Sequence, residues 1–495
     1  MGINKALRNK VFESAGYVLF LRVLDKFSSI FTIIILARLL DPGDFGLMSL
    51  AMIVVTLVQS LSSISLEAAI VQKAEVSNSD LNVAWTFSRL IKSLIIIIIV
   101  FFSAPFIGEF FNEPDLTLIL QVMMIAHIFI AFENIGMIIY TKELNFQKVF
   151  YVGIISRFIR IFVFIISAYY LRSVWAFVFA YISLYFSTFV LSYFFHPYRP
   201  KLEFDLKVFK SLFNFGGWIF ASQIIRALFD TIDRAAVGRL MDATFLGFYH
   251  ISHRLGNEMP NELKSVFNTT FFPLFSIQQD NLERSKKNFL KTLKLTSFII
   301  FPIISIMFLL SDFLVILLLS NKWNQAIDPL KILLVAALMR SLVFTTFPLF
   351  KGLGFPKYET YLIGISVIFI SIFIFPLVSN YGIEGAAFTI LIGHLAIVPV
   401  AFFFLKKIIS IEINDIFFAL FKPALVSIVG GLLIYGMNLF NSFNISWIHL
   451  FQILLVSFSY FVFVYFVFLK MIKDQEIISV HNLLIAYLQK KIELK

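Results

Sequence analysis

The chain has 495 residues, of which 59% are hydrophobic and 14% are charged. A soluble protein of this length cannot bury so much apolar surface, because burial saturates as domains grow, so that class is excluded. The absence of cysteine excludes disulfide frameworks, thiolate metal sites and cysteine nucleophiles. The formal net charge is +11. The distribution of the basic residues along the chain indicates a membrane topology and argues against a nucleic-acid partner.

The hydrophobic residues form blocks of about 20, the length of a helix that crosses ~30 Å of hydrocarbon. Residues 1–13 are basic, and no small-residue cleavage site follows the first block, so we interpret them as a retained cytoplasmic segment. We expect an all-α polytopic membrane protein with about fourteen transmembrane helices. The predicted spans are 14–38, 44–66, 81–106, 116–140, 149–170, 174–195, 211–237, 243–272, 292–318, 327–350, 359–379, 384–405, 418–438 and 447–469.

The loops between these spans differ in charge. Lys and Arg gather in the even-numbered loops and at both termini, as in residues 199–210 and 284–294. The odd-numbered loops and their borders hold only Arg38, Arg172, Arg239 and Lys322. Because basic residues accumulate on the cytoplasmic side of a membrane, the pattern predicts that both termini face the cytoplasm.

A repeated motif indicates an internal duplication. Residues 38–41 read Arg-Leu-Leu-Asp and are followed by Gly46, while residues 239–242 read Arg-Leu-Met-Asp and are followed by Gly247, an offset of 201. A second pair, 144–148 and 353–357, shares Leu-x-Phe-x-Lys at nearly the same offset. Six spans separate the copies, so both halves have the same orientation, with the substrate path between them. The residues themselves also suit a tight turn, with Arg38 reaching the interface.

The duplication defines the predicted domains. We expect an N-terminal lobe of six spans over residues 1–210 and a C-terminal lobe of six spans over 211–405. Two extra helices follow over 406–470. Residues 471–495 repeat apolar positions between polar ones and end in lysines, which predicts an amphipathic helix on the cytoplasmic leaflet.

Ionisable residues inside spans mark pathways, because a charge facing lipid is expensive. Several share one helical face, and basic residues outnumber acidic ones, so they predict a wet cavity that attracts an anion such as phosphate. The alternative is that they form internal ion pairs, such as Arg226–Asp230–Arg234. Asp25, Asp230 and Asp233 are the candidates for a coupling proton or sodium ion. The candidate cavity residues are Arg22, Asp25, Lys26, Arg89, Arg226, Asp230, Asp233, Arg234, Arg254, Glu258 and Arg340.

Other polar residues in the spans are weaker candidates for a functional site. Arg157 and Arg160 come early in their span and are expected near the cytoplasmic surface. His250 and His253 have helical metal-ligand spacing, but no third ligand accompanies them, so we expect neither a metal nor a cofactor.

The chain resembles the polysaccharide transporter family, the Wzx-type flippases and the colanic-acid or teichuronic-acid exporters. These are related to the MATE drug exporters and the lipid II flippase. The resemblance spans nearly the whole length and is carried by residues 36–46, 66–73, 233–239 and 272–276. It implies two six-helix lobes that open alternately to the two sides of a bacterial inner membrane. The implied substrate is an undecaprenyl-pyrophosphate-linked oligosaccharide, flipped outward for surface polysaccharide, with a polymerase and chain-length proteins as partners.

Two alternatives stay open. A MATE-like cation-coupled exporter of small molecules would need a compact, acidic and aromatic pocket. A membrane enzyme of polysaccharide assembly would need a large outside loop for catalytic residues, whereas every predicted outside loop is short. A flippase makes and breaks no covalent bond, so we expect a transporter with no catalytic residue.

Overall fold

The computed structural model describes residues 31–61, 66–73, 75–143, 145–206, 229–277 and 281–440, with isolated positions at 20, 24, 28, 29, 227, 279, 452, 455 and 459. Within these residues the secondary structure is helical, and the chain forms two compact units. Unit 1 contains residues 1–255, 318–332 and 367–393, and unit 2 contains the rest. The predicted lobes, with boundaries at 210 and 405, stay a prediction.

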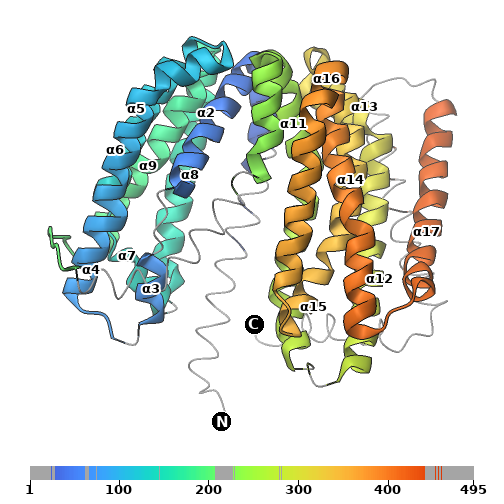
Figure 1. Ribbon diagram of the computed structural model, residues 1–495. Coiled ribbons are helices and arrows are strands. Elements are labelled where there is room, and N and C mark those ends of the chain that lie inside the picture. The colour runs from blue at the N-terminus through green and yellow to red at the C-terminus, as the bar shows by residue number, and fades with distance from the viewer. Residues whose placement is uncertain are drawn as a thin grey trace. The chain divides into compact units, whose positions relative to one another are not determined.

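Unit 1 is built mainly from the first half of the chain (Figure 1). A helix over 31–39 precedes α2 Pro42–Leu61, and the remaining helices pair as α5 with α6, α6 with α9 and α8 with α9. Asn112 ends α5 in the left-handed conformation, with φ of 56°. The bounds are α3 Leu66–Gln72, α4 Asn78–Trp85, the π-helix η1 Thr86–Ile91, α5 Lys92–Phe111, α6 Asp115–Phe132, α7 Met137–Lys142, α8 Phe146–Leu171 and α9 Trp175–Phe195.

Unit 1 also takes in parts of the second half: a helix over 229–240, the start of α11 Ala243–Ile277, and residues 318–332 and 367–393. Trp323 anchors one of these parts, because its buried indole donates to the carbonyl of Ala37 at 2.7 Å. The same ring packs edge-on against Phe45 and Phe248. Elements from both halves of the chain therefore share one core.

The two copies of the repeated motif meet within unit 1. A Cβ atom on Gly46 would lie 1.7 Å from the carbonyl oxygen of Ala243, and one on Gly247 would lie 1.8 Å from that of Pro42. Nearby, the carboxylate of Glu113 accepts a hydrogen bond from the Ala243 backbone at 2.9 Å. We call this junction, formed by the loops after the first, third, seventh and ninth predicted spans, the odd-loop end.

Unit 2 packs around the apolar faces of its longest helices. Phe275, Phe289, Phe347 and Phe350 are fully buried in its main core, and α12 lies against α17. Lys286 of α12 joins Asp415 of α17 at 2.8 Å. The remaining bounds are α12 Leu282–Leu309, α13 Ser311–Phe313, the π-helix η2 Leu314–Leu319, the 3-10 helix η3 Asn321–Ala326, α14 Ile327–Phe344, α15 Thr346–Gly352, α16 Lys357–Ile409 and α17 Ile413–Phe440.

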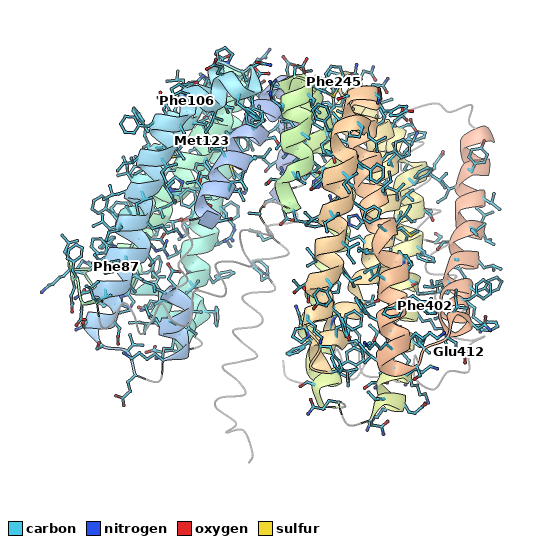
Figure 2. All side chains as sticks on the ribbon, in the orientation of Figure 1. Phe87, Phe106, Met123, Phe245, Phe402 and Glu412 are labelled. Atoms are coloured by element: carbon cyan, nitrogen blue, oxygen red, sulfur yellow. The ribbon has the colours of Figure 1, made fainter. Side chains whose placement is uncertain are left out.

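Nine helical stretches in the described part of the chain are long and apolar enough to cross a membrane. The predicted spans 359–379 and 384–405 both lie within α16, which consists of two helices that meet at a kink at Gly382, where φ is 60°. Span 447–469 and most of span 14–38 lie outside the described residues. Large apolar side chains cover the outer faces, as Phe106 does on α5, while Met123 of α6 is fully buried (Figure 2). The protein is therefore an all-α, multi-pass membrane protein, and the count of fourteen is compatible with this structure.

Candidate functional site

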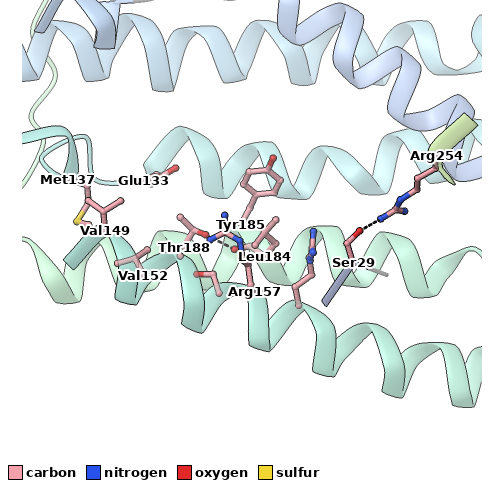
Figure 3. Close-up of a pocket in the computed structure, with 13 residues that line it drawn as sticks. Ser29, Glu133, Met137, Val149, Val152, Arg157, Leu184, Tyr185, Thr188 and Arg254 are labelled. Atoms are coloured by element: carbon pink, nitrogen blue, oxygen red, sulfur yellow. Dashed lines mark hydrogen bonds between the residues drawn. The ribbon is translucent and has the colours of Figure 1, made fainter. Parts of the chain in front are cut away.

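A cavity of about 630 Å³ lies in unit 1 along α8 and α9 (Figure 3). Three arginines line it: Arg157 and Arg160 from α8, and Arg254 from α11. Arg157 and Arg160 are three residues apart, so the helix places them on one face. Glu133, at the end of α6, is the carboxylate on the wall. Among the described residues, the cavity lining therefore carries more positive than negative charge.

Arg254 is held in place by a neighbouring serine. Its guanidinium donates to the hydroxyl of Ser29 at 2.6 Å (Figure 3). Ser29 lies in the first half of the chain and Arg254 in the second, so the contact joins the halves at the cavity wall. An arginine in this position presents a planar array of donors that suits a phosphate group.

A second cavity of about 250 Å³ shares lining residues with the first, namely Ser29, Arg160, Leu184 and Arg254. Apart from those, its walls are largely apolar and aromatic, with Met48 and Met52 of α2 and Phe164 and Phe177 of α8 and α9. Ser49 and His250 add polar contacts, and the His250 ring lies 3.2 Å from the Ser49 hydroxyl. Together the two cavities form one site with a basic part and an apolar part.

Glu133 is tied to a half-buried arginine behind the cavity wall. The guanidinium of Arg89 lies 3.0 Å from the carboxylate of Glu133 and 3.0 Å from that of Glu67. Arg89 is thus balanced by two carboxylates. These two ion pairs join η1 to α3 and to the end of α6. The positive charge of the cavity therefore comes from Arg157, Arg160 and Arg254.

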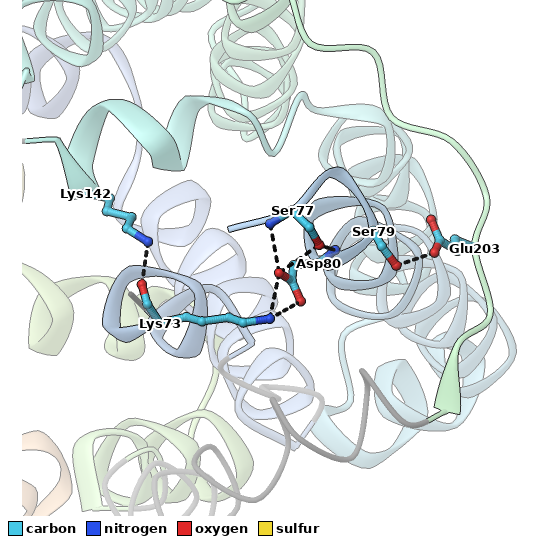
Figure 4. Close-up of polar contacts among 6 residues, drawn as sticks. All are labelled: Lys73, Ser77, Ser79, Asp80, Lys142 and Glu203. Carbon is cyan, nitrogen blue, oxygen red and sulfur yellow. Dashed lines mark hydrogen bonds and ion pairs between the residues drawn. The ribbon is translucent and has the colours of Figure 1, made fainter. Parts of the chain in front are cut away.

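Polar contacts also join the short helices α3, α4 and α7 in unit 1 (Figure 4). Asp80 accepts from the backbone of Ser77 and pairs with Lys73 at 2.7 Å, which caps α4 at its start. Ser79 bonds Glu203, and Lys142 donates to the carbonyl of Lys73. These contacts join α3, α4 and α7 to one another and to the segment after α9.

The predicted cavity residues are placed as follows. Arg254 lines the cavity, and Arg89 stands behind its wall. Asp233 and Arg234 belong to a buried cluster beside α11, while Asp230 is exposed. Arg340 lies in unit 2, over the ring of Phe344. Arg22, Asp25, Lys26 and Arg226 lie outside the described residues, as does the side chain of Glu258.

The structure adds residues that sequence reasoning did not place in the cavity. Arg157 and Arg160, expected near the cytoplasmic surface, were not among the predicted cavity residues, yet both line the cavity, together with Tyr185 and Thr188 of α9. Their spacing showed a shared helical face, and nothing in the sequence showed what that face meets. His250 and His253 contact Ser49 and Asp233 respectively, and the described residues hold no cluster of three potential metal ligands.

Comparison with solved structures places the fold in a known class of transporters. The chain superposes on the lipid II flippase MurJ in an inward closed conformation with a TM-score of 0.71, 14% identity, and coverage of 93% of this chain and 99% of MurJ. An inward-facing MATE family multidrug resistance transporter gives a TM-score of 0.60 at 16% identity, covering 77% of this chain and 94% of that one. The chain therefore shares the fold of MurJ and of this MATE family protein.

The family follows from the sequence comparisons. The chain belongs to the polysaccharide biosynthesis protein family, whose model matches residues 35–328. It is 25% identical over 338 residues to the lipopolysaccharide biosynthesis protein WzxC of Escherichia coli (strain K12), with 68% of each chain covered. It is 19% identical over 374 residues to the teichuronic acid biosynthesis protein TuaB of Bacillus subtilis (strain 168), covering 75% of this chain and 77% of TuaB. The predicted family resemblance is confirmed.

Proposed function

We propose that the protein is a flippase that moves undecaprenyl-pyrophosphate-linked oligosaccharides across the bacterial cytoplasmic membrane for surface polysaccharide assembly. The observation that carries the proposal is the two-part site, in which three arginines adjoin an apolar, aromatic chamber. A pyrophosphate would bind the guanidinium groups through charge-assisted hydrogen bonds. Translocation itself needs no catalytic residue, because no covalent bond changes.

Alternating access is the mechanism that the repeated architecture supports. At the odd-loop end, backbone of the first half packs directly on backbone of the second at Gly46 and Gly247. On the excess of basic residues in the even-numbered loops, we infer that this end faces the periplasm and that both termini face the cytoplasm. The contact would then close the site to the periplasm, and its separation would release substrate outward to a polymerase and chain-length proteins.

The charge of the site favours this function over export of a cationic drug. A cation would meet Arg157, Arg160 and Arg254, while the nearby carboxylate of Glu133 is already paired with Arg89. Placing a further positive charge beside these three arginines would cost Coulomb energy. The charge of the cavity therefore suits an anionic headgroup.

The test is binding of farnesyl diphosphate, an isoprenoid diphosphate, to the purified full-length protein. We expect Arg254→Gln and Arg157→Gln each to weaken binding by roughly tenfold or more, because each removes charge-assisted hydrogen bonds. Arg172→Gln is the matched control, because this arginine is exposed in an odd-numbered loop. Wild-type affinity in both cavity variants would contradict the proposed function.

The same variants extend the test to cells. In a strain whose surface polysaccharide depends on this protein, Arg254→Gln and Arg157→Gln should reduce export, while membrane levels of the protein stay normal. Arg172→Gln should export normally.

A further inference from the structure

Glu113 and Lys322 occupy equivalent positions of the internal repeat but carry opposite charges. They are 209 residues apart, the offset that separates residues 144–148 from 353–357. Glu113 lies in the loop after α5, and Lys322 lies in η3, the first element after η2. Both loops belong to the odd-loop end, and each of the two side chains bonds the opposite half of the chain.

The carboxylate of Glu113 holds the start of α11, in the second half. Its Oε1 atom accepts a hydrogen bond at 2.9 Å from the backbone N–H of Ala243, the first residue of α11. The first N–H groups of a helix have no partner within the helix, and the helix dipole makes this end positive. A carboxylate therefore stabilises this position through both its charge and its hydrogen bond.

The ammonium of Lys322 holds the end of the helix over 31–39, in the first half. Its Nζ atom donates to the backbone carbonyls of Arg38, at 3.4 Å, and Leu40. The same atom lies 3.3 Å from the carboxylate of Asp41. The last carbonyl groups of a helix lack internal partners and form its negative end, so a cation is the matching charge here.

The opposite charges follow from a difference between the two copies of the repeated motif. At the offset of 201, the counterpart of Ala243 is Pro42, the first residue of α2. Proline has no backbone N–H, so this copy offers no such donor to a carboxylate. It offers carbonyl groups and Asp41 instead, and Lys322 bonds these. Each charge is thus matched to the groups that the opposite half presents.

The two contacts are strong enough to favour a closed end and weak enough to be broken. Lys322 is 29% exposed and Asp41 is 81% exposed, so water reaches their contact. Glu113 is partly exposed as well. When the halves separate, water can replace each partner, so a hydrogen bond to a charged group contributes only a small net stabilisation.

We propose that Glu113 and Lys322 form a reciprocal latch that holds the odd-loop end closed and sets how often it opens. The proposal rests on the proposed function and adds the residues that control this conformational equilibrium. Neither residue lines either cavity, so the latch acts through the positions of the helices that it holds. Loss of either charge should shift the population toward the open state.

The test is the reactivity of a cysteine placed behind the latch in the full-length protein. Ser49→Cys is a small change at a residue that is 1% exposed, and the chain has no other cysteine. In spheroplasts, a membrane-impermeant maleimide should label this cysteine slowly. Adding Lys322→Met should raise the labelling rate by roughly tenfold or more. Adding Glu113→Gln should raise it by about threefold, because glutamine keeps an acceptor oxygen but loses the charge.

The matched controls change charges of the same sign at the same end. Asp115→Asn removes an exposed acid two residues from Glu113, and Arg172→Met removes an exposed base from another odd-numbered loop. Both should label at the rate of Ser49→Cys alone. Lys322→Arg keeps a cationic donor and should stay within about twofold of that rate.

Exchanging the two charges separates a latch from an effect of net charge. Glu113→Lys combined with Lys322→Glu keeps the net charge but sets an ammonium against the N–H of Ala243 and a carboxylate against the carbonyl of Leu40 and against Asp41. Labelling should then be faster than in either single variant. An unchanged rate in the exchanged variant would overturn the latch.

The remaining outcomes are also decisive. An unchanged rate in Lys322→Met would overturn the latch, and this result decides if the exchanged variant does not fold. Rapid labelling of Ser49→Cys alone would overturn the latch by showing that the odd-loop end is already open. None of these measurements uses substrate, so binding of farnesyl diphosphate still tests the flippase separately.

Discussion

Ser49 and His250 are 201 residues apart, the offset of the internal repeat, and their side chains contact each other at 3.2 Å. Equivalent positions of two repeats can touch only where the axis that relates them passes between the two. The glycines of the motif follow the same rule, because Gly46 packs against Ala243 and Gly247 against Pro42. The odd-loop end is therefore a symmetric contact between α2 and α11.

The first prediction concerns these glycines. We expect Gly46→Ala and Gly247→Ala each to lower the free energy of unfolding by about 2 kcal/mol or more, since the added Cβ would strike a backbone oxygen that cannot move alone. Thermal unfolding of the purified protein in detergent measures the effect. Gly364→Ala is the control, because a Cβ there meets nothing within 4 Å. Equal stability of the three variants would contradict this contact.

The second prediction concerns Trp323, which joins residues 318–332 to the first half. Trp323→Phe should keep much of the packing but leave the buried carbonyl of Ala37 without its donor, at a cost of about 1–3 kcal/mol. Trp323→Ala should cost more, about 3–5 kcal/mol, because it also leaves a cavity between Phe45 and Phe248. Chemical unfolding measures whether Trp323→Ala costs more stability than Trp323→Phe. Trp175→Phe, at a half-buried tryptophan, is the reference. An unaffected Trp323→Ala protein would refute this role.

The third prediction concerns pH and His196, just beyond α9. Burial lowers the pKa of His196 below its ordinary value of 6.5, and its Nδ1 atom accepts a hydrogen bond from the backbone of Tyr198 at 3.1 Å. The unfolded chain therefore binds the proton more readily, so stability is fully present above pH 6.5 and decreases as the pH falls through it. Unfolding measured at a series of pH values tests this. His196→Gln should flatten the acid side of the profile, and a wild-type profile with no such decrease would contradict it.

Helix positions and the duplication could be predicted from the sequence, because both depend on local patterns. Block length alone located α8 and α9, and the repeated Gly46 and Gly247 marked the contact between the halves. The sidedness of the loops stays a prediction.

The cavity could be predicted only in part. Helical spacing shows which residues share a face, but it does not show what that face meets. Arg157 and Arg160 therefore looked peripheral yet line the site. Asp230 and Asp233 share a stripe, yet one is exposed and the other is buried against Tyr249. Such differences arise from packing between helices far apart in the chain.

The central claim is that the two halves separate at the odd-loop end during each transport cycle. A Cβ on Gly238 would lie 3.5 Å from Cγ of Leu50, where a cysteine sulfur would sit, so Leu50→Cys with Gly238→Cys should form a disulfide. The chain has no other cysteine to interfere. We predict that oxidation of the double variant stops transport and reduction restores it, while each single variant transports in both conditions. Full transport by the quantitatively cross-linked protein would contradict the account.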